Sequence, residues 1–350
     1  MKKILFATTA IVAVAALNAP AYADISMSGS MKQQIGMANN EEDSKVAEFA
    51  TFDIQSDSEI AFKYTTSLDN GIKISGAIEL EGDGAGIDES SFTIQGDFGS
   101  VMIGANDGSG DDFADKPSRG DIGNHDNYIV SRGLNNALGD NAVMDQSGDH
   151  QKIKYTTPNL GGLKMGVSYT PEMAQGGGGS MANRVGDTSS EIEFGMQYSF
   201  DMDGTGVDLA YAFGKEGGDG STATEGRKGH HASVITKFGD FKAGVAYGRV
   251  MGSHESADDD GRALQAGISY SAGAMGVGVY HQKTSTEQAA GGGEDTRVVN
   301  GIFLDYDVAD GVKFSSAIFN DTMKAGESGV ASSTFNTGGW GLIGGLKVSF

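Results

Sequence analysis

Apolar and polar residues alternate with a period of two along most of the chain. In "ISMSGSMKQQIGM", the residues Ile25, Met27, Met31, Ile35 and Met37 share one set of positions, and mostly serine, lysine and glutamine fill the other. Successive side chains of a β-strand point to opposite faces. The pattern therefore predicts a strand with one apolar and one polar face.

This pattern returns about sixteen times. The predicted strands lie near 25–37, 50–66, 71–81, 90–97, 100–106, 151–157, 162–170, 190–200, 206–214, 230–238, 241–250, 262–271, 274–284, 297–308, 311–320 and 338–350. Turn residues such as "DNG" at 69–71 join the strands in pairs, which is a strong hairpin signal. Between the hairpins lie long polar loops such as "NNEEDSKVAE", "EGDGAGIDE" and "TSTEQAAGGGED".

Alternation fits either a soluble β-sandwich or a transmembrane barrel, and three observations favour the barrel. An even strand number near sixteen is large for one sandwich, and short turns alternate with long loops as in outer-membrane barrels. Aromatic residues gather at the ends of the apolar faces, as in interfacial girdles: Tyr64, Tyr155, Tyr169, Tyr198, Phe213, Tyr247, Tyr270 and Trp340. We therefore predict an all-β fold, a transmembrane antiparallel barrel of about 16 strands with short periplasmic turns and long extracellular loops.

The polar face of the predicted strands carries many charges, including several lysines. Charged side chains are costly against lipid, so this face is expected to line a lumen filled with water. A barrel of about sixteen strands is wide enough for an aqueous channel.

The first 23 residues have the features of a secretory signal peptide. "MKK" is followed by an apolar run over 4–17 that is short for a membrane helix, and "AYA" precedes Asp24. We predict cleavage after Ala23, which leaves a single domain over 24–350.

Charge and composition exclude several functions. The formal net charge is −22, and loss of Lys2 and Lys3 with the signal peptide takes it to −24, which argues against a nucleic-acid partner. There is no cysteine, and the histidine spacing matches no zinc site. "DGSGDD" and "DDDG" lack the ligand spacing of an EF-hand. We expect no cofactor, apart from weak calcium or magnesium binding by acidic loops.

The chain closes on "TGGWGLIGGLKVSF", which alternates up to Phe350. A closed barrel has no free edge, so its last strand must pair with its first. We expect Phe350 on the apolar face at the periplasmic rim.

The segments "GDFGSVMIGAND", "KIKYTTPNLGGLKMGVSYTP" and "LKVSF", together with the signal peptide, resemble the trimeric general porins of Gram-negative bacteria, particularly the alphaproteobacterial type. The resemblance implies a homotrimer in the outer membrane that passes small hydrophilic solutes by passive diffusion. It implies contact with outer-membrane lipid and lipopolysaccharide, and it makes Phe350 an assembly signal for the barrel-assembly machinery.

The resemblance also implies that the third long loop, here roughly 107–150, folds into the lumen and narrows it. Its acidic candidates for the constriction are Asp107, Asp111, Asp112, Asp115 and Asp121, although some of them could be solvated turn residues. General porins place a basic cluster, often of arginines, opposite such acids. The inward positions here offer Lys32, Lys63 and Lys73 with no arginine among them, which departs from that pattern. A mild preference for cations is expected from these charges.

Two other classes of function stay open at this point. A barrel enzyme of the lipase or protease type would need a nucleophile, a base and an orienting group, and we assign no such set. An exported adhesive or structural β protein is the other. The protein is therefore predicted not to be an enzyme, and conductance across a planar bilayer separates the three classes.

Overall fold

The computed structural model describes residues 24–42, 52–82, 86–122, 147–172, 190–217, 227–251, 260–287, 294–324 and 336–350. The predicted signal peptide and residues 123–146 of the third long loop lie outside these ranges. Among the described residues, no helix is both long enough and apolar enough to cross a membrane.

The described residues form sixteen strands that close into one antiparallel barrel in sequence order. The first eight are β1 (Asp24–Glu42), β2 (Phe52–Ser67), β3 (Lys73–Glu81), β4 (Gly86–Gly96), β5 (Gly99–Ala105), β6 (Gln151–Thr156), β7 (Leu163–Thr170) and β8 (Ser190–Met202). The others are β9 (Thr205–Gly217), β10 (Lys228–Phe238), β11 (Phe241–Met251), β12 (Gly261–Ala272), β13 (Met275–Glu287), β14 (Glu294–Ala309), β15 (Val312–Lys324) and β16 (Asn336–Ser349). The predicted all-β barrel is confirmed.

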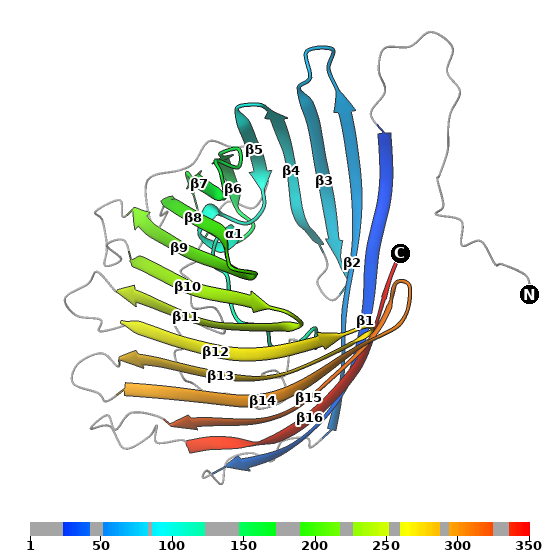
Figure 1. The fold of residues 1–350 in the computed structure, drawn as a ribbon, viewed down its shortest axis with the longest axis vertical. Helices are drawn as coiled ribbons and strands as arrows, with labels where there is room; N and C mark the ends of the chain where they lie inside the picture. The colour runs from blue at the N-terminus through cyan, green and yellow to red at the C-terminus, as the bar shows by residue number, and fades with distance from the viewer. Residues whose placement is uncertain are drawn as a thin grey trace, which may run out of the picture.

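Strands β1 and β16 close the barrel, as Figure 1 shows for the blue and red ends of the chain. Their register pairs Met31 with Val348 and Met37 with Leu342. All four side chains point outward and are at least 40% exposed, whereas Gln34 on the other face of β1 is 1% exposed. The two-residue pattern therefore separates a lipid-facing surface from a lumen, as predicted.

Short turns gather at one end of the barrel, which we call the short-turn end. Gly71, Gly204, Gly239, Gly273 and Gly311 each have a positive φ in one of these turns, a conformation that glycine adopts without strain. The long connections lie at the opposite end, which we call the long-loop end.

Several strands run further toward the long-loop end than the sequence predicted. β1 extends to Glu42, β4 begins at Gly86 and β14 begins at Glu294, so parts of three predicted loops are strand instead. These boundaries were wrong because backbone pairing continues where the apolar alternation has already stopped; the last described pair of β1 and β16 joins Glu42 to Thr337. The point at which the sequence turns polar therefore marks the edge of the lipid layer, whereas the paired strands continue beyond it.

The wall is uneven in height. β5, β6 and β7 have 7, 6 and 8 residues, whereas β1 has 19 and β2 and β14 have 16 each. The third long loop begins and ends at this low part of the wall, between β5 and β6.

Candidate functional site

The described part of the third long loop lies inside the barrel, and Glu193 of β8 holds both of its ends. The Glu193 side chain is buried on the lumen face. One carboxylate oxygen accepts a hydrogen bond from the Gly110 amide at 2.6 Å, and the other accepts one from the Ser147 hydroxyl at 2.6 Å. A single carboxylate therefore fixes the outgoing and the returning segment of the loop to the same place on the wall.

Two lysines of β6 reinforce this attachment. The Lys152 ammonium donates to the carbonyls of Asn106 and Gly148, again one at each end of the loop. Lys154 forms an ion pair with Asp112 at 2.7 Å. Because hydrogen bonds to charged groups are stronger than neutral ones, the buried lysines and Glu193 give the loop a rigid base.

A short helix, α1 (Ser109–Asp112), and the following Phe113 rest on two paired glycines. Gly166 of β7 lies opposite Gly195 of β8 in the ladder. A Cβ atom at Gly166 would come within 2.7 Å of the Phe113 ring, and one at Gly195 within 2.5 Å of it. Because neither glycine has a side chain, the lumen wall is flat at this point and has room for the Phe113 ring.

The loop then runs along the wall past several further strands. Gln197 of β8 donates to the Asp115 carboxylate, and His231 of β10 approaches the Asp115 carbonyl at 3.0 Å. Arg119 reaches Gln282 of β13 at 2.7 Å. Over a few residues the loop thus passes from β8 to β13 without leaving the lumen wall.

The far end of the described segment is anchored by apolar packing. Ile122 is fully buried, and Gln34 of β1 donates to its carbonyl at 2.5 Å. It belongs to a buried apolar cluster on the lumen side of the barrel: Ala38, Ile122, Tyr280, Val299, Phe303, Ala317, Phe319 and Ile343. The sequence predicted a lumen lined by polar residues, so an apolar cluster on the lumen wall differs from that prediction. The wall is apolar here because Ile122 of the loop packs against it, and this packing removes apolar surface from water.

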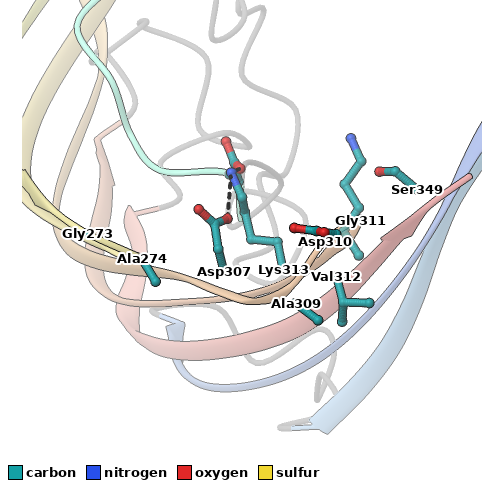
Figure 2. A pocket seen from close by; sticks show the side chains of 11 residues that line it. Gly273, Ala274, Asp307, Ala309, Asp310, Gly311, Val312, Lys313 and Ser349 are labelled. Carbon is teal, nitrogen blue, oxygen red and sulfur yellow. Dashed lines mark hydrogen bonds and ion pairs between the residues drawn. The ribbon is translucent and has the colours of Figure 1, made fainter. Parts of the chain in front are cut away.

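Asp121, next to this anchor, joins the loop to the short-turn end. Its carboxylate pairs with Lys313 of β15 at 2.5 Å, and its amide donates to Asp305 of β14 at 3.1 Å. Asp121 and Lys313 border a pocket of about 680 Å³, where Figure 2 shows Lys313 and Asp307 directed toward each other. The ion pair between Lys313 and Asp307 measures 3.7 Å.

The predicted acidic residues therefore occupy different places along the loop. Asp112 and Asp121 are exposed and paired with lysines of the wall, whereas Asp107, Asp111 and Asp115 are partly buried. Asp107 stands near Glu89 and Asp149, with ligand oxygen atoms of all three within 4.8 Å of one another. Whether these acids control permeation stays a prediction.

The predicted basic residues are on the lumen side of β1, β2 and β3. Lys32 pairs with Asp57 at 3.2 Å and Lys63 with Glu79 at 3.8 Å, while Lys73 is exposed near the short-turn end. Their described ion pairs are thus with neighbouring strands of the wall. Their role opposite the loop stays a prediction.

The structure also reveals a row of lysines that the strand-by-strand analysis could not identify. Lys347 of β16 lies directly opposite Lys32 on one side and Lys313 on the other. The outer members of the row are ion-paired with acids, but Lys347 forms no ion pair with any described residue. The alternation of the strands shows that each lysine faces inward. Their alignment in a row can be seen only from the register in which β1, β16 and β15 pair.

Glu193 and Ile122 are the functional residues that sequence analysis missed most clearly. Glu193 occupies a polar position in the alternation of its strand, but nothing in the sequence indicated its contact with residue 110. Ile122 stands within a polar loop, and an isolated isoleucine there was the only available signal.

Comparison with known proteins identifies a family whose model matches this chain. A family model described as Gram-negative porin matches residues 7–321 of the chain. No curated protein matches the chain. Among solved structures, a loop-deletion mutant of OmpT from Vibrio cholerae aligns with a TM-score of 0.63 and 14% identity, covering 94% of this chain and 99% of that one.

Two further structures extend the comparison. The trimer form of OmpT from Vibrio cholerae has a TM-score of 0.62 and 13% identity over 94% of this chain and 99% of its own. An anion-selective porin from Comamonas acidovorans has a TM-score of 0.60 and 16% identity over 94% and 100% of the two chains. At such identities the similarity to these structures establishes a shared fold.

Proposed function

Because the chain belongs to the Gram-negative porin family, it is a channel protein of the outer membrane, and we propose that it passes small hydrophilic solutes and ions by passive diffusion. The observation that carries this proposal is the path of the third loop. From Lys154 on β6 to Gln34 on β1, residues 107–122 follow the inner wall and narrow the lumen from one side.

Conductance in a planar lipid bilayer tests the proposal. The purified protein is expected to produce discrete steps of ionic current that increase with salt concentration. An intact, correctly folded protein that opens no steps would refute it. Such a result would favour the adhesive or structural alternative, or a barrel enzyme of the lipase or protease type if substrate turnover were found.

We further propose a mild preference for cations. Its support is the acidic character of the loop, with Asp107, Asp111, Asp112 and Asp115 close together in sequence and a net charge of −22 on the chain. Acidic groups near the mouth raise the local concentration of cations. One solved relative is described as anion-selective, so the fold alone does not determine a cation preference and the sign of selectivity must be measured.

A homotrimer is the proposed assembly. One structural relative is described in a trimer form. In addition, β5, β6 and β7 have 7, 6 and 8 residues, shorter than the roughly 9–11 residues of a strand that crosses a bilayer. Such a low wall is better covered by a neighbouring subunit than by lipid. Cross-linking in mild detergent that stopped at the monomer would refute this.

The remaining partners are proposals as well: lipopolysaccharide around the barrel, and the barrel-assembly machinery acting on the strand that leads to Phe350. Weak calcium or magnesium binding is proposed for the acidic loops, with Glu89, Asp107 and Asp149 as the described residues best placed to supply oxygen ligands. We propose no catalytic activity.

A further inference from the structure

A row of five charged side chains crosses the lumen wall where the last strands meet the first. The ladders of β14, β15, β16, β1 and β2 pair, in this order, Asp307, Lys313, Lys347, Lys32 and Asp57. An aspartate thus stands at each end of the row, and three lysines stand between them. Like charges directly opposite each other on neighbouring strands are destabilising. A negative group is therefore favoured next to the central lysine, Lys347.

The row neutralises its outer lysines and leaves the central one. Lys32 is paired with one aspartate at 3.2 Å, and Lys313 is paired with two, at 2.5 and 3.7 Å. Lys347 is exposed and forms no ion pair with any described residue. The ammonium group that most needs an anion is thus also the one that a solute can reach.

Lys347 shares the pocket of about 680 Å³ at the short-turn end with an acid, Asp310 (Figure 2). Asp310 lies in the turn between β14 and β15, is exposed, and takes part in no ion pair within the described part of the chain. A backbone hydrogen bond of 2.7 Å from Ser349 to Gly311 joins the segments that carry the two residues. An acid and a base that border one pocket without pairing leave space for a solute that contacts both.

The charges of the pocket restrict the chemistry of that solute. The charged lining residues are three aspartates and two lysines, which give a formal charge of −1: Asp121, Asp307, Asp310, Lys313 and Lys347. This balance disfavours a simple anion. A metal ion is disfavoured too, because the one group of three potential metal ligands among the described residues is Glu89, Asp107 and Asp149, in another part of the barrel. A solute that carries one positive and one negative group matches the pocket best.

We propose that this pocket binds small zwitterions with an ammonium and a carboxylate group, such as free amino acids. The carboxylate lies on Lys347 and the ammonium on Asp310. Ser349, two residues from Lys347 on the same face of the strand, lines the pocket and supplies a hydroxyl donor to the carboxylate. The inference rests on the proposed channel function and assigns one class of solute to it.

The first test compares three probes on the full-length protein purified in detergent, with binding followed by saturation-transfer NMR of the probe. L-glutamine carries both charges, N-acetyl-L-glutamine lacks the ammonium, and L-glutaminamide lacks the carboxylate. L-glutamine should bind about fivefold more tightly than either analogue, which is the upper range of what one exposed ion pair contributes.

The second test repeats the comparison on two pocket variants. Lys347→Gln should weaken L-glutamine and N-acetyl-L-glutamine about fivefold and leave L-glutaminamide unchanged. Asp310→Asn should weaken L-glutamine and L-glutaminamide and leave N-acetyl-L-glutamine unchanged. A misfolded variant would lose all three probes, so this crossed pattern distinguishes lost contacts from lost structure. The matched controls Lys164→Gln and Asp69→Asn change the same charges at the short-turn end outside the pocket, and should bind within about twofold of the wild type.

Three results would each overturn the proposal: equal binding of the three probes to the wild type, no saturable binding of any probe, or equal behaviour of pocket and control variants. Step conductance in a bilayer, measured on the same preparations, separates the inference from the channel function. Zwitterion binding without current steps would refute only the channel function, whereas current steps without saturable binding would refute only the inference.

Discussion

Phe350 and Gly29 exchange two backbone hydrogen bonds, each 3.0 Å long, beyond the last ladder pair of β16 with β1. The Phe350 ring also lies over Gly29, where an added Cβ would come within 2.9 Å of it. The same Cβ would approach the Glu59 carbonyl of β2 to 2.5 Å. The junction of the first and last strands is thus completed by an aromatic ring that fits only over a glycine.

Deletion of Phe350 should reduce the amount of folded barrel in the outer membrane. The deletion removes two hydrogen bonds, each contributing about 1 kcal/mol, together with the contact of the ring at the closing seam. The measurement is the fraction of protein that shows heat-modifiable migration in gels of isolated outer membranes. Phe350→Tyr serves as a control because it keeps the backbone and a ring of similar size. Equal folded amounts of the wild type and the deletion variant would show that Phe350 is dispensable for assembly.

Replacement of Glu193 by glutamine should loosen the third loop without unfolding the barrel. Glutamine carries no charge, so the hydrogen bonds that join this side chain to the Gly110 amide and the Ser147 hydroxyl lose their charge assistance. Hydrogen bonds to charged groups contribute about 1.5–3 kcal/mol and neutral ones about 0.5–1.5 kcal/mol, so each bond should weaken by about 1 kcal/mol. The expected result is noisier single-channel current with altered step size.

Asp208→Asn is the appropriate control for that experiment. Asp208 also faces the lumen, but its described ion pair, at 4.0 Å, is with Lys237 of the wall. If both variants gave the same current as the wild type, the attachment of the loop would not depend on Glu193.

A methyl group at residue 195 should displace the loop from the wall. In Gly195→Ala, the new Cβ would meet the Ser109 carbonyl at 2.4 Å and the Phe113 side chain at 2.5 Å. Overpacking of this kind typically costs about 1–3 kcal/mol. Gly206→Ala is the matched control, since its Cβ would have no neighbour closer than 3.8 Å. We expect a lower unfolding midpoint in detergent and changed conductance for Gly195→Ala alone; equal behaviour of the two variants would contradict the packing argument.

The fold was largely predictable because its cause is local. Alternation, hairpin turns such as 69–71 and the need to pair a last strand with a first one follow from neighbouring residues and from the lipid environment. The boundaries at Glu42 and Gly86 failed for a related reason. Hydrophobic alternation reports contact with lipid, whereas the ladder continues into water wherever a partner strand continues too.

The site was predictable only in part because its contacts join distant positions. The acids of residues 107–121 were identified by type, but their partners Lys154 and Lys313 depend on how the loop crosses the lumen. Glu193 meets Gly110 across 83 residues of sequence. No periodicity encodes such a contact. The paired glycines that accommodate Phe113 likewise look, in sequence, like ordinary strand glycines.

The last prediction concerns ion selectivity. Asp107, Asp111, Asp112 and Asp115 lie on the segment that narrows the lumen, and we expect them to favour cations at low salt. Screening extends over about 10 Å at 0.1 M salt, so only charges near the narrow part act strongly on a permeating ion. The preference should therefore fade as salt rises.

Changing these four aspartates to asparagine should lower the cation preference and leave barrel and trimer intact. The change also leaves Lys154 without the carboxylate of Asp112, its partner at 2.7 Å, which adds to the positive potential at the loop. The observable is the reversal potential across a salt gradient, measured for wild type and variant side by side.

The control changes four aspartates of the short turns, Asp69, Asp97, Asp203 and Asp240, to asparagine and removes the same charge away from the loop. Anion preference in the wild type would refute the proposed selectivity. Equal shifts in the two variants would show that net charge, rather than the loop, determines it.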